Sequence, residues 1–339
     1  MDESRPHDSL FRFAFEDPRH AAPLIRTAMG RDSRYAAMLP YIAFDEMRRI
    51  DASVVDAADR PFETDLLFEA PIRVPGDEEQ RVVFVPIPEH KSHMDRGTAW
   101  QSMRYQIRAI DWYRSQPGCS SRWPLVITIV FYHGAEPWTA ARDLRDLFEL
   151  PEHLPPPVRA GIRSLMPSGT YLLDDLRAAA DDDYDERKMP LVAHVAVQFL
   201  KHLARSDLND LERHLTRLRA FLVGLMELPN GRPFLGALFW YLMVTTTAAP
   251  SEVRETIKNV IPKPTGDVML NALQRDYRRV LEQGLAEVLV RLMTKRFGPP
   301  SESHLACIGR ASIAQLEDWT LRVLDATTAD EVVCDGPPA

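Results

Sequence analysis

The chain has 339 residues, of which 45% are hydrophobic and 27% charged, and its formal net charge is −8. This is the composition of an ordinary globular protein, long enough for two or three domains. The negative charge argues against a general polyanion binder, so any contact with nucleic acid has to come from a local basic patch.

The cysteines and the hydropathy pattern indicate a soluble, cytoplasmic protein. Cys119, Cys307 and Cys334 form no pair with metal-ligand spacing, and an odd number of cysteines is not a disulfide framework. The N-terminus "MDESRPHDSL" is polar and acidic, unlike a signal peptide. The longest apolar run, which starts at Phe234, is too short to cross a bilayer, so no membrane contact is expected.

The first expected elements are two short helices over residues 8–29. Apolar side chains recur there at helical spacing, Asp17-Pro18 interrupts the pattern, and Gly30 suits a helix end. Asp8 is expected to cap the first helix, with His7 outside it.

A β-hairpin is expected next, with strands over residues 64–72 and 81–87 and a turn from Gly76 to Glu79. An amphipathic helix over 96–116 follows. Its apolar stripe is formed by Trp100, Met103, Ile107, Ile110 and Trp112.

Residues 123–134 form an apolar run rich in β-branched side chains, which is typical of a central strand covered on both faces. The order of helices and strands predicts an α/β fold with a mixed sheet flanked by helices. After Pro151 the pattern changes: 155–157 and 181–186 look like linkers, and nearly everything from 190 to 297 is helical. Two or three short helices are expected to end the chain.

Asp65, Glu89 and Lys91 form the constellation that suggests chemistry. Asp65 opens one arm of the hairpin and Glu89 closes the other, so antiparallel pairing could bring the two carboxylates to one edge of the sheet. Paired carboxylates bind a hard cation such as Mg²⁺. Lys91 shares a strand face with Glu89 and could place an attacking water or offset phosphoryl charge.

The E-x-K spacing is weak evidence by itself, because charged residues are common in any chain. It gains weight because lysine is scarce here and because the triplet ends an apolar strand. The alternatives are that Asp65 and Glu89 are solvated carboxylates and that Lys91 is an edge-strand gatekeeper.

Four ordered motifs carry a family resemblance: "HDSLFRFAF" at 7–15, "TDLLFEA" at 64–70, "PEHKS" at 88–92 and "VFYHGAEPWT" at 130–139. Together they resemble the recombination-promoting nuclease family, also described as YhgA-like putative transposases, over roughly residues 7–200. The stretch from about 281 to 333 is similar to a small helical domain of unknown function that often follows this nuclease domain.

The resemblance implies a restriction-endonuclease-like fold of the PD-(D/E)XK superfamily that acts as a metal-dependent DNA endonuclease linked to recombination or mobile elements. Asp65 and Glu89 would be the Mg²⁺ ligands and Lys91 the catalytic lysine. Three departures are Arg12 near a common lysine position, Thr64 before the aspartate, and Pro88, which could introduce a bulge and re-aim Glu89. The implied division is a nuclease-like core over 1–150, a helical extension over 151–280 and a small helical domain over 281–339.

For several other residues, the sequence allows more than one role. Arg104 and Arg108, one helical turn apart, could grip DNA phosphates or form a solvated helix face. Trp100 is expected in the core. His133 is expected to be structural, with a phosphate contact as the alternative, and Gly134 is expected to meet a turn requirement. His90 and His93 lack the further ligands that a zinc site needs.

Two rival functions remain. A decayed nuclease fold could act as an interaction module for DNA or protein. In the nuclease hypothesis, the helical C-terminal half is expected to supply dimerisation, giving a homodimer, or DNA positioning. A transposase with a carboxylate triad would need a third acid on the strand at 123–134, and that strand has none.

Overall fold

The computed structural model describes residues 6–50, 66–74, 77–116, 123–185, 188–323, 326 and 328–333. Asp65 lies outside the described residues. The chain divides into two compact units, 1–265 and 266–339. The three-part division expected from the sequence stays a prediction.

The chain begins with two helices, as predicted: α1 (Pro6–Phe15) and α2 (Pro18–Gly30). Asp17 lies between the two helices and is the N-cap of α2: its side chain accepts a hydrogen bond from the Arg19 backbone N–H at 2.9 Å. The prediction that Asp8 caps α1 was wrong, because the helix already begins at Pro6. Three single-turn elements, α3 (Ser33–Ala36), η1 (Leu39–Tyr41) and η2 (Phe44–Glu46), lead into the sheet.

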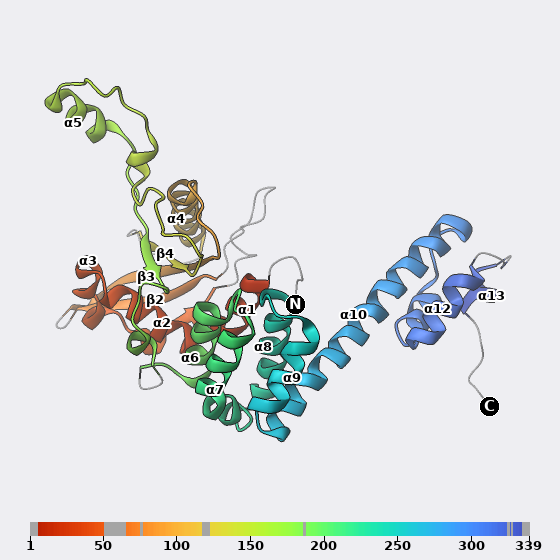
Figure 1. The fold of residues 1–339 in the computed structure, drawn as a ribbon. Helices are drawn as coiled ribbons and strands as arrows, with labels where there is room; N and C mark the ends of the chain where they lie inside the picture. The colour runs from red at the N-terminus through yellow and green to blue at the C-terminus, as the bar shows by residue number, and fades with distance from the viewer. Residues whose placement is uncertain are drawn as a thin grey trace. The chain divides into compact units, whose positions relative to one another are not determined.

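The sheet has the strand order β1-β2-β3-β4-β5, and Figure 1 labels β2, β3 and β4. Its strands are β1 (Arg48–Arg49), β2 (Phe68–Val74), β3 (Asp77–Lys91), β4 (Leu125–Tyr132) and β5 (Leu172–Asp175). β1, β2 and β3 pair antiparallel, whereas β3, β4 and β5 pair parallel. The predicted mixed α/β sheet is therefore confirmed. Of the turn expected at 76–79, residues 77–79 belong to β3 instead, and Gly76 lies outside the described residues.

Helices cover both faces of the sheet. α4 (Thr98–Ser115) connects the parallel strands β3 and β4 and packs on one face, while α1 and α2 lie against the other (Figure 1). The helix at 96–116 was predicted correctly, but its buried face was not. The side chains that α4 buries are mostly small: Thr98, Ala99, Ser102, Tyr105 and Ala109. Trp100 and Ile107 are instead 53% and 46% exposed, because small side chains let the helix backbone approach the strands.

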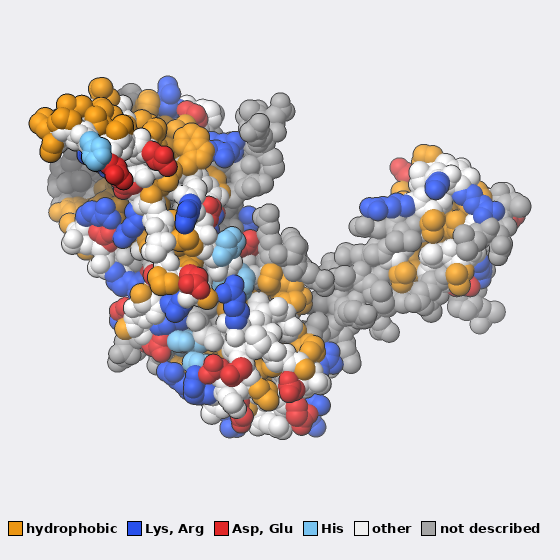
Figure 2. All heavy atoms as spheres, turned by 45° about the horizontal axis from the view of Figure 1, so that its top comes forward, with side chains coloured by type: hydrophobic (Ala, Val, Ile, Leu, Met, Phe, Trp, Pro, Cys, Tyr) orange, Lys and Arg blue, Asp and Glu red, His pale blue; other side chains and the backbone are white. Residues whose placement is uncertain are grey.

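An arm extends from the sheet between η4 (Leu144–Leu147) and β5 and carries α5 (Pro156–Leu165) (Figure 1). Proline occupies the first helical positions of α5, as it often does, so the run expected to be a linker starts a helix. No residue of α5 is buried. Hydrophobic side chains gather at the end of the arm in Figure 2, and Leu165 is 88% exposed.

The rest of the first unit is helical, as predicted. A short turn, η5 (Asp181–Tyr184), leads to α6 (Leu191–Gln198), which continues as the π-helical turn η6 (Phe199–Leu203). α7 (Leu208–Leu225), α8 (Gly231–Thr245) and α9 (Pro250–Val260) follow. α8 is apolar on nearly all sides and is buried against α1, which explains the long hydrophobic run.

The second unit is formed by most of α10 (Lys263–Phe297) and by α11 (Glu302–Ile308), α12 (Ile313–Arg322) and α13 (Ala329–Val333). Its own core includes Leu289, Met293, Leu316 and Trp319. Ser301 and Ser312 cap α11 and α12. Within the described part of the chain, no helix combines the length and the apolar character that crossing a membrane requires.

Candidate functional site

The carboxyl ends of β3, β4 and β5 meet at one edge of the sheet because these strands are parallel. The register pairs Lys91 with Tyr132 and Tyr132 with Asp175, so all three strands end at the same level. In open α/β sheets, ligands bind outside the carboxyl ends of the strands. The polar residues at these ends therefore form the candidate site.

Glu89 and Lys91 point to the face of the sheet that α4 covers. Lys91 Nζ lies 3.7 Å from Glu89 Oε1. Gln101, in the first turns of α4, links the two: its Oε1 accepts a hydrogen bond from Lys91 Nζ at 2.7 Å, and its Nε2 donates to Glu89 Oε1 at 3.3 Å. Gln101 Nε2 also lies 2.5 Å from the Tyr105 hydroxyl oxygen, which fixes the amide.

Both charged side chains of this pair are withdrawn from water. The Glu89 side chain is 7% exposed and the Lys91 side chain 13%. A buried carboxylate and a buried ammonium are costly unless they are paired and hydrogen-bonded, and here each compensates the other. The alternatives of solvated carboxylate and exposed gatekeeper lysine therefore do not describe Glu89 and Lys91.

Pro88 does not disturb the geometry of Glu89 relative to β4. The parallel register runs without a shift from Phe84, opposite Leu125, to Lys91, opposite Tyr132, and Pro88 lies opposite Ile129 within it. The irregularity in the neighbouring pair falls between Ile72 and Val74, far from the site. The bulge considered for Pro88 is therefore absent from this ladder.

Asp95 is a further acidic residue at the site that the sequence did not single out. Its Oδ2 lies 3.5 Å from Lys91 Nζ, and its Oδ1 accepts the Gly97 backbone N–H at 2.8 Å. The signal that could have found it is the sequence Asp95-Arg96-Gly97 just before a helix, since aspartate stabilises such turns through its own backbone. Gln101 gave no comparable signal, because its role depends on the packing of α4 against β3.

His90 points to the opposite face of the sheet, as alternation along a strand requires. Its Nδ1 lies 3.1 Å from Asp8 Oδ1 on α1, and its ring stacks on that of His133 at a centroid distance of 4.6 Å. His7 joins this cluster: its ring centroid is 4.8 Å from that of His133, and its Nδ1 is 3.0 Å from the Tyr241 hydroxyl oxygen. Burial, followed by the neighbouring His90 and Arg205, lowers the pKa of His7 to about 4.

The remaining residues predicted for the site are placed as follows. Asp65, the second expected metal ligand, lies outside the described residues, and Leu66, the next residue in sequence, is 1% exposed. Arg104 is exposed on α4, whereas Arg108 is partly buried. Trp100, expected in the core, lies exposed on the same helix.

The described residues alone do not make a metal centre. Among them, no group of three histidine, cysteine, aspartate or glutamate side chains is arranged to hold an ion. The oxygen atoms of Glu89 and of the nearby Asp95 and Gln101 are nevertheless the kind that a hard cation prefers. The zinc site weighed for His90 and His93 gains no support.

Fold and site together define an α/β protein with a buried glutamate–lysine pair at the carboxyl ends of parallel strands. The comparison with protein families makes the assignment specific. The chain belongs to the family described as "Putative transposase, YhgA-like", whose model matches residues 5–224. This confirms the resemblance drawn from the four motifs. The chain matches no curated protein and no solved structure.

Proposed function

We propose that this chain is a metal-dependent DNA endonuclease that serves a mobile element or recombination. The observation that carries the proposal is the buried pair of Glu89 and Lys91, held by Gln101 at the carboxyl edge of a parallel sheet. The description of the family as putative transposases supports DNA as the substrate and mobile-element biology as the setting.

The arrangement of strands supports a restriction-endonuclease-like fold. Antiparallel β1, β2 and β3 are followed by the crossover helix α4 and by β4, which pairs parallel with β3. The E-x-K triplet ends β3, at the carboxyl edge of the parallel strands. Asp65 precedes β2 by three positions, and antiparallel pairing directs the N-terminal end of β2 toward the C-terminal end of β3. We therefore propose Asp65 as the second carboxylate.

In the proposed reaction, Mg²⁺ would be held by oxygen atoms of Asp65 and Glu89 and would supply an activated water and charge neutralisation. The chain's own residues have distinct tasks. Glu89 keeps the Lys91 ammonium on the same side of the strand. Lys91 then donates hydrogen bonds that orient the attacking water or offset charge on the phosphoryl oxygens. Gln101 positions both side chains and prevents them from collapsing into a closed ion pair.

DNA would approach along the outer side of α4. Arg104 is exposed about one turn beyond Gln101 on α4. Trp100, four residues before Arg104 on the same helix, is 53% exposed. An arginine can bind a backbone phosphate, and an exposed aromatic ring can stack on a base of an opened strand. Because the net charge is −8, this local patch has to provide the attraction.

The test is nicking of a supercoiled plasmid by the full chain with Mg²⁺, Mn²⁺ or Ca²⁺. Activity should appear with Mg²⁺ or Mn²⁺ and should be lost in Asp65→Ala, Glu89→Gln and Lys91→Ala. Lys258→Ala, which removes an exposed lysine from α9, is the matched control and should retain it. If no cation supports nicking, the chain is better described as a decayed nuclease fold that binds DNA or protein.

We also propose that the chain forms a homodimer; the only ground for this is its helical second half. Sedimentation at two concentrations tests it, because a dimer predicts a mass twice that of the 38.6 kDa chain. A constant monomer mass would remove this part of the proposal.

A further inference from the structure

A second polar hollow lies at the same edge of the sheet, on the face opposite Glu89 and Lys91. Its volume is about 220 Å³. The residues that border it include His7, Ser92, His133, Arg177, Lys201 and Arg205. They come from α1, from the segments that follow β3, β4 and β5, and from the end of η6. Three strand ends therefore converge on this hollow, and none of its lining residues is acidic.

His133 is a buried polar group whose side chain faces this hollow. It is 6% exposed, and neither of its ring nitrogens has a hydrogen-bond partner in the described part of the chain. Buried polar groups are nearly always hydrogen-bonded, so an unpartnered imidazole that borders a cavity points to a ligand.

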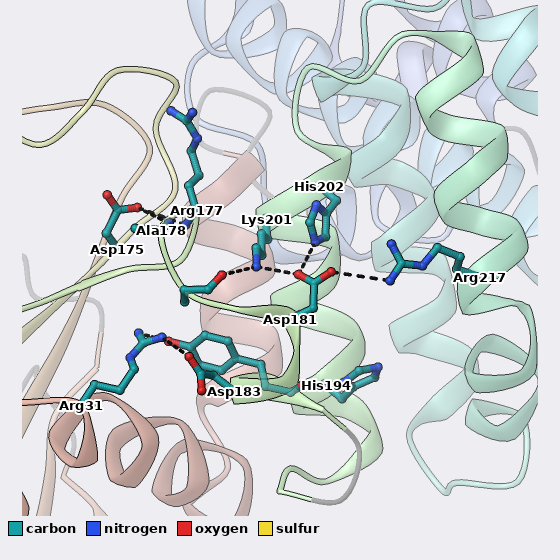
Figure 3. Close-up of polar contacts among 12 residues, drawn as sticks. Arg31, Asp175, Arg177, Ala178, Asp181, Asp183, His194, Lys201, His202 and Arg217 are labelled. Carbon is teal, nitrogen blue, oxygen red and sulfur yellow. Dashed lines mark hydrogen bonds and ion pairs between the residues drawn. The ribbon is translucent and has the colours of Figure 1, made fainter.

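The basic residues around the hollow differ in how their charge is balanced. Lys201 is neutralised, since its Nζ donates to Asp181 Oδ1 at 2.6 Å, and the same carboxylate also contacts His202 and Arg217 (Figure 3). Among the described residues, the Arg177 guanidinium donates to the backbone carbonyls of Gly134 and Ala135, and it forms no ion pair with a carboxylate. Arg205 forms no ion pair with the described residues, and its backbone has a φ of 61°.

Two guanidinium groups therefore border the hollow without a carboxylate partner among the described residues. Guanidinium groups match the geometry of phosphate oxygens and bind them in bidentate fashion. The imidazole of His133 adds an N–H donor, and the Ser92 hydroxyl adds another at the end of β3. A cation is disfavoured here, because the charged residues that border the hollow, Arg177, Lys201 and Arg205, are all positive. The His90 and His133 rings are also stacked instead of converging on a point.

We propose that this hollow binds a phosphate group, either free inorganic phosphate or the terminal monoester of a DNA strand. Arg177 and Arg205 supply the charge, and His133 and Ser92 supply neutral donors. The site is separate from the metal site proposed above, since the sheet lies between His90 and the side chains of Glu89 and Lys91. The inference therefore stands whether or not the chain cleaves DNA.

The test is isothermal titration of inorganic phosphate into the full chain without divalent metal, in buffer of matched ionic strength. The Glu89→Gln background keeps the result independent of the proposed nuclease. Saturable binding is expected, and Arg205→Gln should weaken it by about tenfold, the effect of one lost hydrogen bond to a charged group. Arg219→Gln, which removes an exposed arginine from α7, should leave the affinity unchanged.

Arg205→Asn is the second variant, because asparagine tolerates a positive φ and so protects the fold. A terminal-phosphate source predicts that a 5′-phosphorylated oligonucleotide competes with inorganic phosphate while its 5′-hydroxyl counterpart does not. A free-phosphate source predicts that neither oligonucleotide competes. The proposal is overturned if the Glu89→Gln protein shows no saturable binding, or if both Arg205 variants in this background bind phosphate as tightly as Arg219→Gln.

Discussion

Glu89 and His90 are adjacent in sequence but serve opposite faces of one sheet. The Glu89 carboxylate accepts a hydrogen bond from Gln101 on α4, while the His90 imidazole meets Asp8 on α1. The strand end "EHK" thus contributes to two polar clusters at a single edge. We propose the first for metal-dependent hydrolysis and the second, through the neighbouring His133, for binding a phosphate group.

The Gln101 side chain is predicted to be a positioning residue for the Glu89–Lys91 pair. Gln101→Met keeps the size of the side chain but removes its hydrogen bonds to Glu89, Lys91 and Tyr105, so nicking should fall by about tenfold while the unfolding midpoint changes less. The pH profile of nicking should also shift, because the Glu89–Lys91 pair is no longer held in place by α4. Gln106→Met on the same helix, away from the site, is the control. Equal activities and pH profiles for the two variants would contradict the role.

Arg104 is predicted to contact a DNA phosphate. Arg104→Gln should weaken binding of duplexes of unrelated sequence by a similar factor, and it should lower the slope of log affinity against log salt by about 1. Fluorescence anisotropy at several salt concentrations measures both quantities. Arg219→Gln carries the same charge change on a different helix. If the two variants lower the slope equally, general charge and not a contact at α4 attracts DNA.

Gly134 follows His133 at the carboxyl edge, and its role differs from the one expected. A Cβ atom there would lie 2.3 Å from the Tyr132 hydroxyl oxygen, so the close approach of the ring, and not a turn conformation, requires glycine. Tyr132 is fully buried and its hydroxyl donates to the Glu136 carbonyl at 2.5 Å, so the ring cannot easily move. Gly134→Ala should therefore destabilise the fold by about 1–3 kcal/mol, as measured by urea unfolding. Gly161→Ala, where a Cβ meets nothing, should not destabilise it.

The histidines His7 and His133 should make the free energy of unfolding depend on pH. Burial, together with the neighbouring histidines and Arg205, lowers the pKa of His7 to about 4 and that of His133 well below its ordinary value. Asp8 opposes this for His7, and His93 adds to it. In the unfolded chain these imidazoles take up a proton near pH 6.5. Stability is therefore fully present above that pH and should fall as the pH drops from about 6.5 toward 4.

Urea unfolding at pH 7.5, 6 and 5 measures this loss. His133→Gln should flatten the pH dependence, because it removes one of the imidazoles that stay neutral in the folded state. His153→Gln replaces an exposed histidine and should leave the dependence unchanged. The cluster would not be the source if the His133→Gln and wild-type profiles were parallel.

Much of the architecture could be predicted from the sequence because periodicity and breakers are local. Asp17-Pro18 separates α1 from α2, and the β-branched run marks β4. The face that α4 buries was missed, since the sequence suggested its large apolar residues and the sheet instead receives Ala99, Ser102 and Ala109. β5 was missed as well, because a four-residue strand leaves no clear alternation.

The candidate site was predicted only in part, for a related reason. Glu89 and Lys91 could be chosen because alternation along a strand puts them on one face. Asp95 could have been found from the turn sequence that precedes α4. Gln101 belongs to the site only through the packing of α4 against β3, which no spacing in the sequence reveals. His7 and His133 are far apart in the chain and meet only because α1 lies against the ends of β3 and β4.

The central claim is that Asp65 and Glu89 share one divalent cation. Isothermal titration of Mn²⁺ into wild-type, Asp65→Asn, Glu89→Gln and the double variant tests it most directly, with Glu149→Gln as an exposed control. Each single change should weaken Mn²⁺ binding by at least about tenfold. The loss of binding free energy in the double variant should be far smaller than the sum of the two single losses. Wild-type affinity in Asp65→Asn, or no Mn²⁺ binding by the wild-type chain, would contradict it.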